Sequence, residues 1–175
     1  MLSLGALREL GDLFQGSVEQ VFMTEVGICD PRVTDYVGRL MLDFVHVDQI
    51  FRLQTVDGEV IREVSQIEAQ ARLGDHLAIE DRRRLVNRYI GDLTLFWAGV
   101  YPEALRPRLA GADRLIEYVQ RGKRSYDIAS ELSQPGSEPP ADLLRRLSCE
   151  FEACVHGLHL VRASWERLAA SPRTN

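Results

Sequence analysis

Acidic and histidine side chains spaced three or four residues apart are the first groups in this sequence that could do chemistry. They form a pair in the first third of the chain and a trio near its end, namely Asp43 and His46, then Glu152, His156 and His159. In four-helix carboxylate bundles, Glu and His at this spacing project inward from facing helices and hold two metal ions. One hypothesis is therefore a helical-bundle protein, or an enzyme, that binds a metal ion or a small molecule between its helices.

The helical phase of these residues favours a solvated polar face over a metal site. A heptad seam of apolar residues runs through the last predicted helix, at Leu144, Leu147, Phe151, Cys154, Leu158, Val161, Trp165 and Leu168. In that heptad Glu152, His156 and His159 take b and f positions, which point away from the seam. His46 lies roughly 140° from the apolar direction of its own helix, and Asp43 lies at the edge of the apolar stripe. We therefore predict no bound metal and no cofactor.

Asp92 is a carboxylate at the edge of an otherwise apolar helical segment. A buried carboxylate must find partners, or its pKa rises until it is neutral. Tyr118 and Tyr126 flank Gly122 on the next predicted helix, and we predict that Arg side chains or Tyr hydroxyls of a neighbouring helix hold Asp92. A polar contact that orients helices is favoured here over a catalytic acid.

Motifs of nucleophilic or phosphate chemistry are absent from the sequence. The stretch 122–125, Gly-Lys-Arg-Ser, ends like a phosphate loop, but Glu117 stands where that loop needs a glycine. Cys154 lies in the apolar seam and Cys149 lies outside it, which predicts an inert core thiol and an exposed one. No nucleophile elbow, dinucleotide fingerprint or zinc-protease helix motif occurs.

Composition narrows the class of partner and the compartment. The 175 residues carry a net charge of -5, from 21 basic and 26 acidic residues, whereas a nucleic-acid-binding domain is normally basic. The arginine-rich runs at 82–88 and 121–124 are read as solvated faces, which argues against a nucleic-acid partner. No apolar stretch approaches the ~18 residues of a membrane span. With three cysteines and no Cys-x-x-Cys pair, we expect a cytoplasmic protein without disulfides.

Helical apolar spacing along most of the chain predicts an all-α fold, a single compact bundle of five or six helices. The predicted helices cover about residues 7–26, 31–47, 79–101, 113–132 and 141–169. Gly27 ends the first of them, and Asp30 followed by Pro31 begins the second. Residues 51–64 form either a hairpin or part of a helix, and the spacing of the apolar residues that follow favours the helix.

The domain is expected to span residues 1–170, with a frayed tail at 171–175. Gly122 falls in the apolar face of its helix, which predicts that another backbone passes close to it.

The segment from Leu93 to Tyr101 is apolar almost all round. A helix that is apolar on every side is buried, so residues 79–101 are predicted to be the centre of the fold. This segment also offers more apolar surface than one stripe needs, and the C-terminal seam could pair with a second copy. The leading prediction is therefore a non-enzymatic cytoplasmic protein that acts by contact with another protein or with itself. The candidate contact residues are Leu93, Leu95, Phe96, Trp97 and Tyr101.

Overall fold

The computed structural model describes residues 4–51, 76–105 and 114–170. These residues form six α-helices and no strand, which confirms the predicted all-α bundle. The helices are α1 (Leu4–Val21), α2 (Pro31–Phe51), α4 (His76–Val100), α5 (Arg114–Glu131), α6 (Ala141–Cys149) and α7 (Phe151–Ala170), with a π-helical turn at Phe22–Val26 and a 3₁₀ turn at Pro102–Leu105. The predicted tail lies outside the described residues, and so, apart from Phe51, does the predicted hairpin or helix at 51–64.

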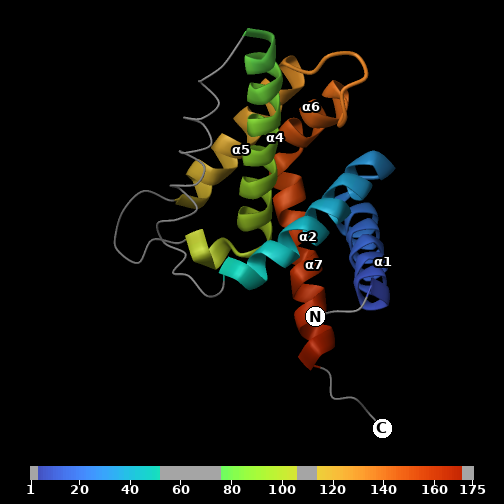
Figure 1. Cartoon of the computed structure of the whole chain (residues 1–175). Helices are drawn as coiled ribbons and strands as arrows, with labels where there is room; N and C mark the ends of the chain where they lie inside the picture. Colours follow the sequence, from blue (N-terminus) through green and yellow to red (C-terminus); the bar gives the residue numbers. More distant parts are fainter. Residues whose placement is uncertain (1–3, 52–75, 106–113, 171–175) are drawn as a thin grey trace.

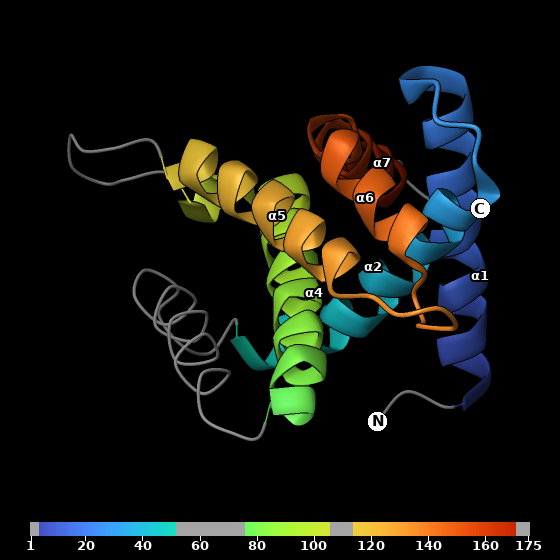
Figure 2. The same ribbon diagram turned by 90° about the horizontal axis from the view of Figure 1, so that it is seen from above.

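α4 is the centre of the bundle. It contacts α2, α5 and α7, and it runs through the middle of the molecule in Figure 1 and in Figure 2. Every residue from Ile90 to Val100 is buried, because helices cover all sides of this half of α4. The prediction that this segment lies at the centre is confirmed. α1 packs on α2 and α7, on the side of the molecule away from α5.

The connection from α1 to α2 follows the predicted stop and start signals. Gly27 has a φ of 84°, in the left-handed region, and its N–H donates to the carbonyl of Phe22, which ends the first helix. Asp30 precedes Pro31, and its Oδ1 accepts a hydrogen bond of 2.9 Å from the N–H of Arg32. These two signals fix where α2 begins, and α2 carries one wall of the site described below.

The prediction of a single C-terminal helix is wrong at one residue, because the chain forms two helices, α6 and α7, that are separated at Glu150. The backbone of Glu150 has φ -100° and ψ 18°, outside the helical region. Its N–H still donates to the carbonyl of Arg146 at 2.9 Å, so the chain passes between the helices without a loop. The apolar seam continues across the break, and its members Leu144, Leu147, Phe151, Cys154, Leu158 and Val161 are buried.

Gly122 lies where α5 meets two other helices. A Cβ at this position would clash with the ring of Phe151 on α7 and with the hydroxyl of Thr94 on α4. The predicted close neighbour is therefore present, and the atoms nearest to a Cβ at this position belong to side chains of α7 and α4. These side chains fill the space that a Cβ on Gly122 would need, as expected of a closely packed interior.

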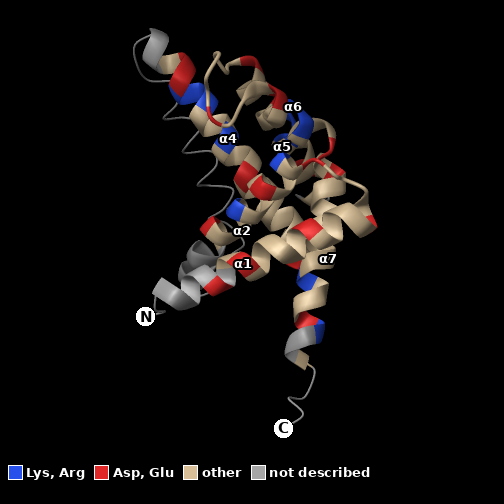
Figure 3. Cartoon of the chain, turned by 90° about the vertical axis from the view of Figure 1, so that its right-hand side faces the viewer, with Lys and Arg blue, Asp and Glu red and all other residues tan. Residues whose placement is uncertain are grey.

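Charged residues of both signs are interspersed over the face of the molecule seen in Figure 3. Of the helices in the described ranges, none combines the length and the apolar character that crossing a bilayer requires.

We expect Gly122→Ala to lower the free energy of unfolding by about 1–3 kcal/mol, because the added methyl group must displace Phe151 or Thr94 in a closely packed core. Gly16→Ala is the matched control, since nothing lies within 4 Å of a Cβ at that position of α1. There the higher helix propensity of alanine should stabilise the chain by roughly 0.5–1 kcal/mol. Urea denaturation measures both changes, and similar effects of the two substitutions would contradict the packing described for Gly122.

Candidate functional site

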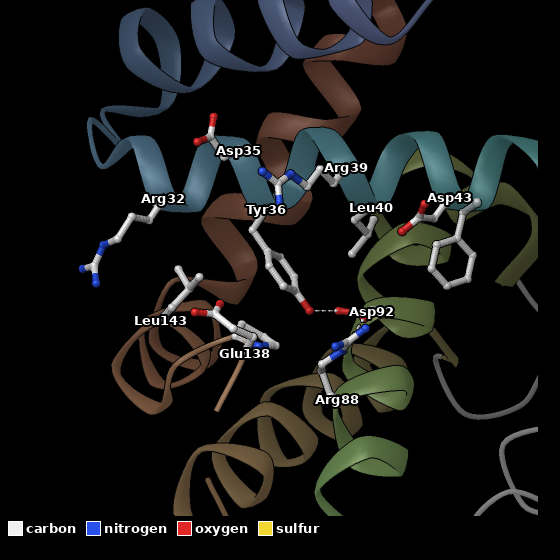
Figure 4. A pocket seen from close by; sticks show the side chains of 12 residues that line it. Arg32, Asp35, Tyr36, Arg39, Leu40, Asp43, Arg88, Asp92, Glu138 and Leu143 are labelled. Atoms are coloured by element: carbon white, nitrogen blue, oxygen red, sulfur yellow. Dashed lines mark hydrogen bonds and ion pairs between the residues drawn. The ribbon is translucent and has the colours of Figure 1, made fainter. Parts of the chain in front are cut away.

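A cleft opens between α2, α4 and the segment that leads from residue 138 into α6. Its volume is about 350 Å³, within the range of small-molecule sites. In Figure 4, α2 runs along one wall, and α4 and the segment before α6 lie opposite. The lining combines apolar, aromatic and charged side chains: Arg32, Asp35, Tyr36, Arg39, Leu40, Asp43, Phe44, Arg88, Asp92, Glu138, Pro139 and Leu143.

Asp92 lies at the inner end of this cleft and connects three helices. The hydroxyls of Tyr36 on α2 and Tyr126 on α5 both donate to its Oδ1, at 2.6 and 2.8 Å. Nε of Arg88, one turn earlier on α4, lies 3.5 Å from Oδ2. Figure 4 shows Tyr36 reaching down from α2 toward Asp92 and Arg88. The prediction that tyrosine hydroxyls of neighbouring helices hold this carboxylate is confirmed, whereas the arginine comes from α4 itself.

Burial changes the acid–base chemistry of this group. Asp92 is 8% exposed, and burial raises the pKa of its carboxyl to about 6, although the tyrosine hydrogen bonds and the charge of Arg88 act in the opposite direction. Burial and the nearby charge of Asp92 raise the pKa values of Tyr36 and Tyr126 well above that of free tyrosine. The two hydroxyls therefore remain donors, while the carboxyl titrates close to neutral pH.

A glycine beside Asp92 allows the Tyr126 hydroxyl to reach it. A Cβ on Gly91 would come within 2.6 Å of two ring carbons of Tyr126, so only glycine admits the ring at this point of α4. On α7, Phe151 packs against the same ring, with centroids 5.9 Å apart. Gly91, which lets the ring of Tyr126 approach, thus directly precedes Asp92, which accepts the hydrogen bond of the Tyr126 hydroxyl.

A network of ion pairs holds α6 against the start of α2. Oδ2 of Asp30 lies 3.1 Å from Arg32 Nη2 and 2.8 Å from Arg146 Nη1. Nη1 of Arg32 lies 2.6 Å from Oδ2 of Asp142. Hydrogen bonds from Arg32 lower the pKa values of Asp30 and Asp142. The charge of Arg32 is therefore compensated within the chain, although its side chain lines the cleft.

The three predicted metal ligands near the C-terminus lie on the outer face of α7. Oε1 of Glu152 accepts a hydrogen bond of 2.7 Å from Nζ of Lys123, and this contact lowers the pKa of Glu152. His156 and His159 are exposed. The heptad phase predicted these outward orientations. Of the three candidate ligands, Glu152 is already paired with the ammonium of Lys123.

Of the other predicted pair of metal ligands, only Asp43 has a described side chain. Asp43 lines the cleft from α2, and the side chain of His46 lies outside the described residues. Within the described ranges, no group of three or more His, Cys, Asp or Glu side chains is arranged to hold a metal ion. Cys154 is buried and Cys149 is exposed, as predicted.

The residues predicted to contact a protein partner are part of the chain's own core. Four of the five are at most 5% exposed, namely Leu93, Leu95, Phe96 and Trp97. Tyr101 is partly buried, with the guanidinium of Arg162 4.9 Å from the centre of its ring. As a correction to the prediction, the first four side chains offer almost no surface to a partner, because helices of the same chain cover them. Phe44 of α2, for example, stacks on Phe96 at a centroid distance of 5.1 Å.

Sequence reasoning missed Tyr36 and Arg88 as members of the site. The pattern places Tyr36 in the apolar stripe of its helix, but a tyrosine hydroxyl that is buried normally needs a hydrogen-bond partner, and that was an available signal. Arg88 belongs to a basic run, yet it stands four residues before Asp92, which is the spacing of a helical ion pair. Nothing in the sequence around Glu138 indicates that this segment lines a cleft.

No protein-family model, curated protein or solved structure matches this chain significantly.

We expect the free energy of unfolding to fall as the pH rises from acidic to neutral, because the buried carboxyl of Asp92 then loses its proton. The pKa of its carboxyl is about 6 in the folded chain, against an ordinary value of 3.8, so the folded chain binds this proton more tightly than the unfolded chain. The resulting stabilisation is complete below about pH 4 and is lost as the pH rises through about 6. Relative to Asp92→Asn, which cannot titrate, the unsubstituted chain should lose roughly 2–3 kcal/mol between about pH 4 and pH 7.

Asp127→Asn is the matched control for this pH experiment, since Asp127 is exposed on α5 and does not line the cleft. Urea denaturation of the three proteins across the pH interval gives the comparison. Parallel pH profiles for the unsubstituted chain and Asp92→Asn would contradict the burial described for this carboxyl.

Proposed function

We propose that this chain binds a small polar molecule in the cleft between α2 and α4. The observation that supports this most directly is the state of the Asp92 carboxylate. Its Oδ1 accepts both tyrosine hydroxyls, whereas Oδ2 has Nε of Arg88 at 3.5 Å and no closer donor among the described residues. Oδ2 therefore keeps the capacity to accept a hydrogen bond. An N–H or O–H group of a ligand in the cleft could donate this hydrogen bond to Oδ2 of Asp92.

The energetics of this carboxylate favour a site over a purely structural bridge. Burying a carboxylate that is not fully hydrogen-bonded is costly, and the raised pKa of Asp92 expresses that cost. Carboxylates with such shifts, placed in a cleft beside a charged partner, occur preferentially at functional sites. A bridge between helices alone would need no opening, yet Asp92 faces one of about 350 Å³.

The lining supports binding more than catalysis. Leu40, Phe44 and Leu143 supply apolar surface around a few polar groups, which is the usual composition of a small-molecule site. The described lining contains no Ser, Thr, Cys or His, so the common pairs of a nucleophile and its base have no representative in it. We therefore propose a binding protein, and cytoplasmic location remains part of this proposal.

The protein contact predicted from the sequence stays a second candidate. The observation that favours it is a set of large apolar side chains that the structure leaves exposed, namely Leu13, Met23, Leu85, Tyr89 and Ile116. Sedimentation velocity at micromolar concentration tests self-association. A species of twice the 19.8 kDa chain mass is the result expected of a homodimer, and a strict monomer would remove that part of the candidate function.

The binding proposal is tested by thermal unfolding with a panel of amino acids, polyamines, nucleotides and sugar phosphates. A ligand at about 100 times its Kd should stabilise the folded chain by about 2.7 kcal/mol, which raises the Tm. Asp43→Trp places a large ring on the wall of the cleft, and Asp12→Trp, exposed on α1, is the matched control. We expect the Tm increase to disappear in Asp43→Trp and to persist in the control. The proposal fails if no compound raises the Tm or if the increase survives in Asp43→Trp.

A further inference from the structure

Resting on the proposed function, we infer that the ligand of the cleft is a zwitterion: a small molecule with one ammonium and one carboxylate group, of the α-amino acid class. The inference follows from the charged side chains of the cleft that have no partner among the residues the structure describes.

Three such side chains line the cleft. Arg39 and Asp43 project from α2, and Glu138 stands in the segment before α6. None of the three makes a hydrogen bond or an ion pair with another described residue. Arg39 and Asp43 are four residues apart, the spacing at which opposite charges on a helix commonly pair. They stay apart here, so one positive and one negative group remain available on the same wall.

The other charged residues of the lining each have a hydrogen-bond or ion-pair partner within the chain. Two aspartates hold Arg32, as described above. Oδ1 of Asp35 accepts a hydrogen bond of 2.8 Å from Nε2 of Gln15. Nε of Arg88 lies 3.5 Å from Oδ2 of Asp92, and a guanidinium has further N–H donors at its terminal nitrogens. Arg88 therefore joins Arg39 as a cation with spare donors.

Both walls of the cleft thus present charges of both signs. Arg39 and Asp43 stand on α2, while Arg88 and Glu138 stand on the facing side (Figure 4). A purely anionic ligand would bring its charge against Asp43 and Glu138, and a purely cationic one would meet Arg39 and Arg88. Either mismatch is costly in a partly desolvated space. A zwitterion places its ammonium at the carboxylates and its carboxylate at a guanidinium, which can bind it through two parallel hydrogen bonds.

The rest of the lining indicates the size and character of the ligand. Leu40, Phe44, Pro139 and Leu143 form apolar surface between the charged groups, suited to an apolar side chain. The volume of about 350 Å³ is at the lower end of the range for ligand sites. An amino acid with an apolar or aromatic side chain matches both features, and L-phenylalanine is therefore the probe.

Isothermal titration calorimetry at neutral pH compares L-phenylalanine with two analogues that each keep one charge. 2-Phenylethylamine retains the ammonium and 3-phenylpropanoate retains the carboxylate. We expect L-phenylalanine to bind at least about 10-fold more tightly than either analogue, because each analogue leaves one set of charged side chains unpaired.

Charge-neutral variants connect this preference to particular side chains. Arg39→Gln should weaken L-phenylalanine by up to about 10-fold, toward the affinity of 2-phenylethylamine, because the ligand carboxylate keeps only Arg88 as a cationic partner. Asp43→Asn should reduce the advantage of L-phenylalanine over 3-phenylpropanoate in the same way. Arg121→Gln and Asp12→Asn, at exposed positions outside the lining, are the matched controls and should leave all three affinities unchanged. Unaltered Tm values of the four variants show that the fold is retained.

The outcomes separate the inference from the proposed function. If an analogue with one charge binds as tightly as L-phenylalanine and Asp43→Trp still abolishes that binding, the zwitterion inference is overturned while the binding function stands. If none of the three compounds binds, or if the affinities do not respond to Arg39→Gln and Asp43→Asn, the inference is also overturned. The panel of other compounds then decides the proposed function separately.

Discussion

Hydrogen bonds from Tyr36 and Tyr126 to the buried carboxylate of Asp92 connect three helices whose residues are far apart in the sequence, 56 positions on one side and 34 on the other. A carboxylate tolerates burial only when donors surround it, so these bonds restrict how α2, α4 and α5 can be placed relative to one another. Apolar packing alone leaves more freedom, since many arrangements bury similar area. The same bonds occupy Oδ1, whereas Arg88 approaches Oδ2, so the group that orders these helices also lines the cleft.

Close packing around α4 depends on glycines at the points where helices meet. Gly91, Gly99, Gly122 and Gly157 each face a large side chain of another helix in the space that a Cβ would fill. A glycine inside a helix costs about 1 kcal/mol relative to alanine, and contacts with the neighbouring side chain offset that cost. The hydroxyl of Tyr126 reaches Asp92 only because Gly91, the residue before Asp92, has no side chain.

The sequence predicts the helices well, because helical periodicity, glycine stops and the Asp30-Pro31 start are local signals. It also predicts the outward orientation of His156 and His159, which follows from the heptad phase. The break at Glu150 has no such signal, since the apolar spacing continues through it. The cleft is still harder to foresee, because it forms where α2, α4 and the segment at Glu138 meet, and no local pattern records which distant residues will be neighbours. The surplus of apolar residues on α4 shows the same limit, since periodicity reports that they are buried but not by what.

The break at Glu150 divides the C-terminal region into two helices that both contribute to the interior, of which only α6 also lines the cleft. α7 contributes Phe151 and Leu158 to the interior, and α6 contributes Leu144 and Leu147. Only α6 also reaches the cleft, through Leu143, and it is tied to the start of α2 by the ion pair of Asp142 with Arg32. Substitutions at Glu138, which is exposed in the segment before α6, can therefore change the lining of the cleft, whereas substitutions at Leu144 or Leu147 of α6 would disturb the interior. Among related chains, sequence divergence confined to the segment before α6 would alter the lining of the cleft while leaving the interior unchanged.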